Sequence, residues 1–180
     1  MKAIAVVDKN LAIGRRGGLI YHIPSDLKHF RRETLGKTLI MGRKTLESMP
    51  GGKPLKGRNT LVLSKNLPEG EFWREDGSYA RVFRTVEELL SFSGTDVVVC
   101  GGAQIYERFI GYCDELIMTE VEGETKDADA FFPEYRNTGT FEEYEDSGPV
   151  EEEGIRYHIR RYRKAGKKFP PEGGQAEDRA

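Results

Sequence analysis

The sequence predicts a single α/β domain of three layers, in which helices cover a central, mostly parallel sheet. Short runs of branched aliphatic residues recur along the chain, as they do where parallel strands are buried on both faces. Helix-like stretches lie between these runs, an alternation that is typical of parallel sheets. The 180 residues are enough for one core, and their 37% hydrophobic and 32% charged content is that of a folded globular chain.

The elements follow in chain order. Strands are predicted at residues 3–7, 38–41, 60–63, 96–100 and 115–121, and helices at residues 24–32, 43–48, 86–90 and 103–110. Residues 140–145 and 155–163 alternate between polar and apolar side chains around an acidic turn, which predicts an antiparallel hairpin at the edge of the sheet. Residues 1–164 therefore form the predicted domain, and 165–180, rich in Gly, Pro and charge, a predicted disordered tail.

Charge and composition exclude several classes of function. The formal net charge is −2, and no run of Lys and Arg is interleaved with aromatic residues, so a nucleic-acid partner is not expected. No apolar run approaches the length of a membrane span, and the first ten residues become charged too early for a signal peptide, which favours the cytoplasm. Cys100 and Cys113 lack the spacing of metal ligands, so both are expected to be packed thiols and no metal site is predicted.

Candidate ligand-binding residues follow the predicted strands, at the edge where parallel sheets bind ligands. Residues 42–45 combine a glycine, two cations and a hydroxyl at a helix start, a pattern suited to phosphate. Ser64 and Lys65 add a hydroxyl and a cation, as a ribose phosphate would require, which favours NADPH over NADH. Residues 100–104 open a helix with two glycines, so that a pyrophosphate can approach the backbone. Each pattern is also common in plain turns and solvated surfaces, but their joint placement favours a nucleotide.

Asp26 is the candidate acid of the substrate site. It stands near the start of the predicted first helix, with Phe30 one turn further along the same face. An acid beside an aromatic wall suggests a ligand. Taken alone, Asp26 is more simply an acid that stabilises the helix dipole, so the surrounding motifs decide between the two interpretations.

Six motifs resemble those of the dihydrofolate reductase family, in its bacterial chromosomal type. In order, they are Ala12-Ile13-Gly14, Ile23-Pro24-Ser25-Asp26-Leu27 with Phe30, Ile40-Met41-Gly42-Arg43-Lys44-Thr45, Pro54-Leu55-Lys56-Gly57-Arg58-Asn59, Gly101-Gly102-Ala103-Gln104-Ile105-Tyr106, and Thr119 with Phe132-Pro133. The match runs from residue 3 to about residue 163. The resemblance implies an eight-stranded, mostly parallel sheet, and an oxidoreductase that uses NADPH to reduce 7,8-dihydrofolate to tetrahydrofolate in one-carbon metabolism. It also implies a monomer.

The resemblance assigns a substrate site. Asp26 corresponds to the buried acid that accepts hydrogen bonds from a pterin ring nitrogen and the exocyclic amine, two donors that fit one carboxylate. Burial should raise its pKa and couple it to protonation of N5 through water, while hydride passes from nicotinamide C4 to C6. Thr119 supports this acid, and Arg58 clamps the α-carboxylate of the glutamate tail as lysine could not. The implied apolar walls are Ile4, Ala5, Leu27, Phe30, Met49, Leu55 and Cys100.

The resemblance also assigns a cofactor site and a lid. The implied NADPH-binding residues are Ala5, Ile13, Gly14, Leu19, Gly42, Arg43, Lys44, Thr45, Leu63, Ser64, Lys65, Cys100, Gly101, Gly102, Ala103, Gln104, Ile105 and Tyr106. A cis peptide is implied between Gly101 and Gly102. Residues 10–23 are similar to the family's mobile loop, which closes over the nicotinamide and excludes water. Asp129 corresponds to an acid of a second loop that steadies the closed lid.

Three positions depart from the family pattern. Tyr21 stands where many relatives have tryptophan; a phenol can still hold a water near the substrate, which makes Tyr21 a second catalytic candidate, but its smaller ring is expected to alter stacking and lid closure. Cys100 replaces a larger aliphatic residue and is expected to loosen the pocket near the pterin carbonyl. The loop at residues 50–53 is about one residue longer than in common bacterial relatives, and the benzoyl end of the substrate meets it.

Two other functions stay open on the sequence. The reductase of riboflavin biosynthesis shares the fold and NADPH, but it lacks the Pro-Ser-Asp-Leu signature and the Arg58 clamp. A nucleotide-binding module without catalysis would fit the changes at Tyr21 and Cys100, whereas an intact Asp26 stands against it. A purely structural role is disfavoured, because the sequence contains no repeat or coiled-coil pattern.

Overall fold

The structure is a computed structural model that describes residues 1–166, and for Phe72 and Trp73 it describes the backbone alone. From residue 167 onward, the predicted tail lies outside the described residues. Within the described range no helix is both long and apolar enough to cross a membrane.

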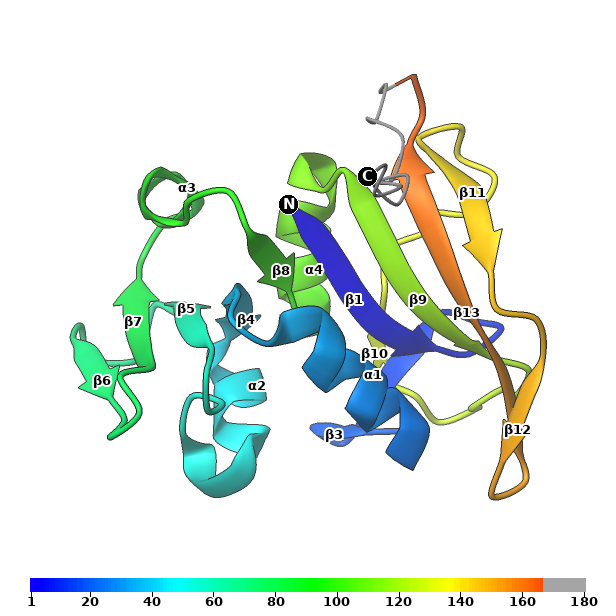
Figure 1. The fold of residues 1–180 in the computed structure, drawn as a ribbon, viewed down its shortest axis with the longest axis horizontal. Helices are drawn as coiled ribbons and strands as arrows, with labels where there is room; N and C mark the ends of the chain where they lie inside the picture. Colours follow the sequence, from blue (N-terminus) through cyan, green and yellow to red (C-terminus); the bar gives the residue numbers. More distant parts are fainter. Residues whose placement is uncertain (167–180) are drawn as a thin grey trace, which may run out of the picture.

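Ten strands of the described part of the chain form one sheet (Figure 1). Their order is β11 (Phe141–Asp146), β13 (Ile155–Lys164), β9 (Glu115–Val121), β1 (Lys2–Val7), β8 (Val97–Val99), β4 (Thr38–Gly42), β5 (Asn59–Leu63), β7 (Tyr79–Phe83) and β6 (Glu71–Trp73), with β12 (Val150–Glu152) beside β13. The strands from β9 to β7 run parallel, and β6, β11, β12 and β13 are antiparallel to their neighbours. The predicted eight-stranded, mostly parallel sheet is confirmed, and the short β6 and β12 extend it.

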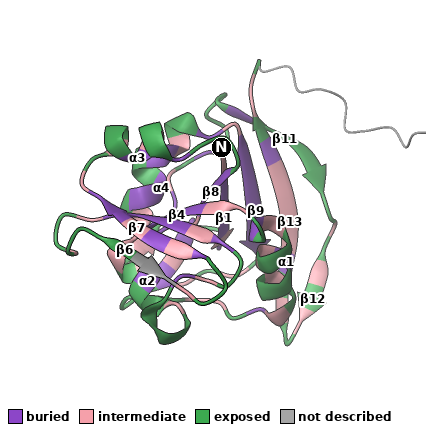
Figure 2. Cartoon of the chain, turned by 60° about the vertical axis from the view of Figure 1, so that its left-hand side comes forward, coloured by how far each residue is buried: buried purple, intermediate pink, exposed green. Residues whose placement is uncertain are grey.

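Helices cover both faces of this sheet, as predicted. The helices are α1 (Pro24–Thr34), α2 (Arg43–Ser48), α3 (Val86–Phe92) and α4 (Ala103–Phe109), with short 3-10 turns at Pro50–Gly52 and Ile110–Tyr112. Side chains of α1 and α2, such as Phe30 and Leu46, pack with Ile4 and Leu39 of the sheet. Side chains of α3 and α4 pack in a second cluster on the other face, and the central strands between them are buried (Figure 2).

Local sequence explains where several of these helices begin. Pro24 occupies the first turn of α1, where its missing N–H costs no hydrogen bond. Thr85 and Glu88 form a capping box at the start of α3, in which each side chain accepts a hydrogen bond from the backbone of the other. The predicted and observed helices differ only by a few residues at their ends.

Besides β6 and β12, the sequence analysis did not predict two further groups of strands. β7 was not predicted, because Arg81 interrupts its apolar pattern; the guanidinium lies over the rings of Phe83 and Phe92, 5.4 and 4.4 Å from their centroids. A separate small sheet of β2 (Ala12–Arg15), β3 (Gly18–Leu19) and β10 (Ala130–Phe131) lies in stretches predicted as loops. The predicted edge hairpin is present as β11 and β13, and β12 lies within its predicted turn.

Candidate active site

Asp26 lies in the first turn of α1 and points to the sheet, where it meets a single polar partner. The hydroxyl of Thr119, in β9, donates a hydrogen bond of 2.5 Å to Oδ1 of Asp26. Burial raises the pKa of the Asp26 carboxyl, and the hydrogen bond from Thr119 acts in the opposite direction. Within residues 1–166 no cation is paired with this carboxylate, and its Oδ2 has no hydrogen-bond donor. The contact predicted between Thr119 and Asp26 is thus present, and the direction of the pKa shift is the one expected from burial.

An apolar surface lies beside Asp26. Four partly buried side chains pack against the hydrophobic cluster on the α1 face of the sheet, which includes Ile4. They are Phe30, Met49, Leu55 and Cys100. The structure thus brings together five of the predicted wall residues from four different segments. Leu27 is 44% exposed, on the outer side of α1, and Ala5 packs in the cluster on the opposite face of the sheet, so only its backbone can reach this side.

Cys100 is half-buried and keeps its proton. Its thiol donates to the backbone oxygen of Val98 over 3.5 Å, and burial raises its pKa, with Arg58 acting weakly against this. The residue therefore behaves as a small apolar wall of the site.

Arg58 is a buried cation without an acidic partner in the described range. Only 6% of the residue is exposed, and its guanidinium donates to Thr34 Oγ1 over 3.3 Å and to the backbone oxygen of Lys56 over 3.1 Å. Burial lowers its pKa, and the nearby Arg31 lowers it further. A buried guanidinium that lacks a carboxylate is an unbalanced charge, so the position is suited to an anionic ligand.

Glycines form a narrow cradle where β4 and β8 end. The N–H of Gly42 donates to the carbonyl of Gly101 over 2.8 Å, and the peptide between Gly101 and Gly102 is cis, as predicted. Gly101 has φ +106°, and a Cβ there would lie 3.0 Å from the ring of Tyr106. The hydroxyl of Tyr106 donates to the carbonyl of Ile4 over 2.7 Å, which fixes that ring below the cradle. The backbone can therefore be approached closely only because these positions lack side chains.

The neighbouring residues of the predicted cofactor site lie around this cradle. A Cβ at Gly102 would lie 3.6 Å from Oγ1 of Thr45, and one at Gly42 would lie 3.2 Å from Cγ1 of Ile105. Leu63 is buried at the end of β5, Ala103 is half-buried, and Gln104 is exposed in the first turn of α4.

The predicted cations stand at the carboxyl edge of β4 and β5. Arg43 forms an ion pair of 2.8 Å with Glu47, and Lys44 and Lys65 are exposed. The hydroxyl of Ser64 accepts hydrogen bonds from the backbone of the next turn, including one of 3.1 Å from Leu67.

Sequence reasoning missed a further cation here. Arg84 follows β7, and its guanidinium donates to the carbonyl of Ser64 over 2.5 Å. If residues 79–83 had been predicted as a parallel strand, Arg84 would have been a candidate ligand-binding residue, because it is the first residue after that strand.

The predicted lid is held by the segment between β9 and β10. The carboxylate of Asp129 accepts a hydrogen bond of 2.8 Å from the backbone N–H of Arg16, which agrees with the role predicted for this acid. Arg15 forms an ion pair of 3.0 Å with Asp127, and the hydroxyls of Tyr21 and Thr125 lie 3.3 Å apart. Gly14 is buried in the lid, Ile13 packs against the core, and Leu19 is 75% exposed. The side chain of Leu19 therefore lies mostly in solvent in this conformation of the lid.

Comparison with known proteins agrees with this geometry. A sequence model of the family described as dihydrofolate reductase matches residues 1–164. The dihydrofolate reductase of Neisseria gonorrhoeae is 36% identical over 159 residues, which cover 88% of this chain and 94% of that protein. Dihydrofolate reductase HdrB of Haloferax volcanii is 38% identical over 138 residues, covering 73% and 70% of the two chains.

A solved structure is similar over nearly the whole fold. Dihydrofolate reductase from Enterococcus faecalis, complexed with NADP(H) and RAB-propyl, has a TM-score of 0.76 and 32% identity, and the match covers 91% of this chain and 95% of that one. The family found is the one that the motifs resemble, and not the rival reductase of riboflavin biosynthesis.

Proposed function

The chain belongs to the dihydrofolate reductase family and is an NADPH-dependent reductase of dihydrofolate, and from this premise we propose that Asp26 anchors the pterin ring and promotes protonation of N5. The observation that carries the proposal is the state of the carboxylate: half-buried, raised in pKa and bonded only to Thr119 among the described residues. The catalytic unit is proposed to be residues 1–164, the range of the family match.

The free positions on Asp26 match the donors of a pterin. One oxygen, Oδ2, has no donor in the described range, and Oδ1 accepts one hydrogen bond from Thr119 and has room for a second. A ring N–H and an exocyclic amine present two parallel donors, which a carboxylate accepts with both oxygens. Because Asp26 is partly shielded from water, these bonds would fix the ring more firmly than they would at the open surface.

The raised pKa gives Asp26 its part in the proton transfer. A carboxyl whose pKa is raised holds its proton to a higher pH than an ordinary carboxyl, and it can thereby raise the availability of a proton for N5, which reaches that atom through water. NADPH, when bound, supplies the hydride that C6 of the pterin takes up. Tyr21 is proposed to hold a water beside the substrate; its hydroxyl is already oriented by Thr125.

Arg58 is proposed to bind the α-carboxylate of the glutamate tail. Its guanidinium is buried, unpaired with any acid in the described range, and positioned by Thr34 and the carbonyl of Lys56. A planar fork of donors fits a carboxylate in a way that the single ammonium of lysine does not. Leu55 and Phe30 would then contact the apolar part of the same substrate.

The cofactor residues are proposed from the glycine cradle and the cations beside it. Gly42, Gly101 and Gly102 leave room at the backbone, and residues 43–45 and 64–65 supply the cations and hydroxyls that a nucleotide phosphate requires. Arg84 adds a cation beside Ser64. The lid, residues 10–23, would cover the nicotinamide end and exclude water.

The test is an NADPH oxidation assay on the full chain. Oxidation is expected only when dihydrofolate is present, and to be slower with NADH, which lacks the ribose phosphate that the cations would bind. Oxidation without dihydrofolate, or an absence of oxidation with it, would contradict the proposed substrate site.

A further inference from the structure

Arg58 is carried by a tight turn, residues 55–58, whose geometry fixes where the guanidinium points. The N–H of Arg58 donates to the carbonyl of Leu55 over 3.2 Å, which closes the turn. Gly57, its third residue, has φ +72°, a conformation that favours glycine. A small change in this turn would therefore shift the base of the Arg58 side chain.

Gly57 is held by hydrogen bonds at both its carbonyl and its N–H. Its carbonyl accepts a hydrogen bond of 2.9 Å from the backbone N–H of Gly36, just after α1. Its N–H donates over 2.9 Å to Oδ2 of Asp76, a residue of the loop that joins β6 to β7. A second bond comes from the same loop, since Arg74 donates from Nη1 to the carbonyl of Pro54 over 3.2 Å. The β6–β7 hairpin thus forms two hydrogen bonds to the segment that carries Arg58.

The hairpin loop is itself ordered, so it can act as a support. The N–H of Arg74 donates to the carbonyl of Ser78 over 2.8 Å, and that of Gly77 to the carbonyl of Arg74 over 3.0 Å. The hydroxyl of Ser78 donates to Oδ1 of Asp76 over 2.5 Å, which leaves Oδ2 facing Gly57. Donation from Ser78, and in smaller part from Gly57, lowers the pKa of Asp76, so the carboxylate is ionised at neutral pH.

We propose that Asp76 and Arg74 are positioning residues for Arg58, and that the β6–β7 hairpin thereby sets the affinity for folates that carry a glutamate tail. The inference rests on the proposed role of Arg58. Neither residue contacts the substrate: they act by holding the turn from Pro54 to Arg58 in place. At the far edge of the sheet, β6 and its loop would otherwise have no part in the reaction (Figure 1).

The expected effect is confined to one kinetic constant. If the turn loosens, the guanidinium samples more positions and the carboxylate of the substrate loses binding energy, whereas Asp26 and the cofactor cradle stay as they are. The KM for dihydrofolate should rise by about threefold to tenfold, the range that corresponds to the net contribution of one ordinary hydrogen bond. The kcat and the KM for NADPH should not change.

The experiment compares Asp76→Ala and Arg74→Gln with the wild type. The matched control is Glu75→Ala, because Glu75 lies between them, carries the same charge as Asp76, is exposed and forms no hydrogen bond or ion pair with the turn in the described part of the chain. Each protein is assayed with dihydrofolate and with a 7,8-dihydropterin that lacks the benzoylglutamate tail. The KM for dihydrofolate is expected to rise in both variants and not in the control, while the KM for the tail-less pterin stays constant. The two variants remove different hydrogen bonds to the turn, so if one of them does not fold, the other still tests the proposal.

Arg58→Lys, measured alongside, separates the two proposals. If Arg58→Lys raises the KM for dihydrofolate and the hairpin variants do not, the hairpin inference is wrong and the clamp stands. If Arg58→Lys affects both substrates equally, the clamp is wrong and the inference falls with it. Equal rises for both substrates in the hairpin variants would also overturn the inference, because they would show a general loss of structure. In the double variant Arg58→Lys with Asp76→Ala, the two effects should be less than additive.

Discussion

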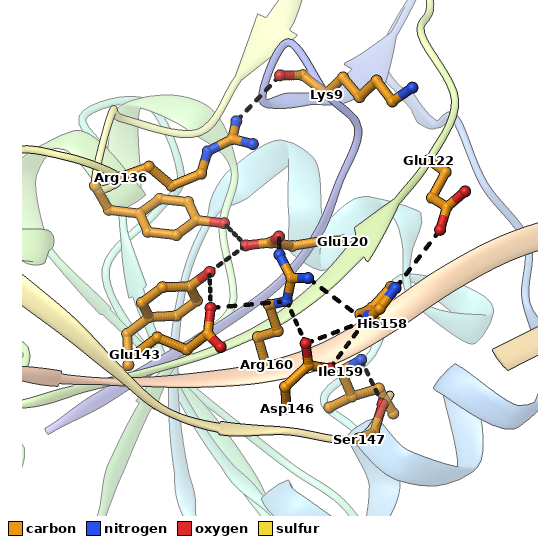
Figure 3. Close-up of polar contacts among 12 residues, drawn as sticks. Lys9, Glu120, Glu122, Arg136, Glu143, Asp146, Ser147, His158, Ile159 and Arg160 are labelled. Atoms are coloured by element: carbon orange, nitrogen blue, oxygen red, sulfur yellow. Dashed lines mark hydrogen bonds and ion pairs between the residues drawn. The ribbon is translucent and has the colours of Figure 1, made fainter. Parts of the chain in front are cut away.

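Thr119 and Glu120 are neighbours in β9, and their side chains point to opposite faces of the sheet, each into contact with buried polar groups. On the α1 face Thr119 donates to Asp26. On the α4 face, which Leu116 and Met118 also line, Glu120 is itself the acid at the centre of a network (Figure 3). Strand β9 therefore lies between two carboxylates, Asp26 on one face and Glu120 on the other, in very different surroundings.

Glu120 has every oxygen satisfied. Its Oε1 accepts hydrogen bonds from the hydroxyls of Tyr135 and Tyr162, the second over 2.7 Å, and its Oε2 accepts one of 2.8 Å from Arg160. Arg160 continues the network to Asp146 over 2.9 Å. Burial raises the pKa of both phenols, and the Glu120 carboxylate raises it further. Burial lowers the pKa of the Arg160 guanidinium, but Asp146 and Glu120 together raise it above its ordinary value.

Asp26 has one partner and no cation in the described range. The two acids also differ in burial, but they differ most clearly in their partners: Glu120 is satisfied and serves the fold, whereas Asp26 is left available for a ligand. A buried acid that the protein itself does not satisfy is costly, and it is retained where the ligand completes it.

The largest expected effect comes from removing the charge of the unsatisfied acid. Asp26→Asn should lower kcat for dihydrofolate at neutral pH by about a hundredfold or more, because the pterin loses its ionised anchor and N5 loses its proton route. Steady-state NADPH oxidation measures this. Glu120→Gln removes the same charge from the other face and should leave kcat within about twofold. Equal losses in the two variants would remove the distinction between the acids.

Next in size is the loss of the tail clamp. Arg58→Lys should raise the KM for dihydrofolate by about tenfold or more, because a single ammonium cannot replace the two parallel donors of the guanidinium. A 7,8-dihydropterin without the tail should bind as well as before. The measurement is the KM for each of the two substrates. A rise in both would indicate that Arg58 supports the structure of the pocket and does not bind the glutamate tail.

Removing the charge of Glu120, the acid whose oxygens are all hydrogen-bonded, should affect the stability of the fold. Glu120→Gln should lower the free energy of unfolding by about 2 kcal/mol, since an amide N–H₂ then faces the guanidinium of Arg160, which keeps only its other acidic partners. Urea unfolding measures this. Glu143→Gln is the control, because Glu143 is exposed and lies 3.8 Å from the same guanidinium. A loss of the same size in Glu143→Gln would show that the buried position of Glu120 is not what matters.

The smallest expected effect is a gain in stability at the unsatisfied acid. The folded-state pKa of Asp26 is raised, so the folded protein binds the proton more tightly than the unfolded chain, and stability falls as pH rises from the ordinary value of 3.8 to the raised one. Asp26→Asn lacks this penalty and keeps an acceptor for Thr119. Its Tm should exceed that of the wild type at neutral pH and equal it below pH 3.8, as thermal unfolding at several pH values would show. A lower Tm at neutral pH would mean that the carboxylate stabilises the fold.

The same comparison shows what the sequence could and could not predict. Asp26 became a candidate because it stands with Phe30 on one face of a helix that begins at Pro24, a local pattern, and the surrounding motifs decided in its favour. Glu120 gave no signal, because within an apolar run it is indistinguishable from an outward-facing residue of an edge strand, and its partners lie 15 to 42 residues away. The contact between Asp76 and Gly57 was missed for the same reason, since it depends on β7 being recognised as a strand beside β5.

The most direct test of the contrast between the two acids is the pH dependence of kcat/KM for dihydrofolate, in the wild type and in Asp26→Asn. In the wild type, kcat/KM should fall as pH rises through the raised pKa of Asp26, because the proton that the carboxyl helps to supply is then lost. In Asp26→Asn, kcat/KM should be low and flat over the same range. Parallel profiles in the two proteins would contradict the account, because the titrating group would then lie elsewhere.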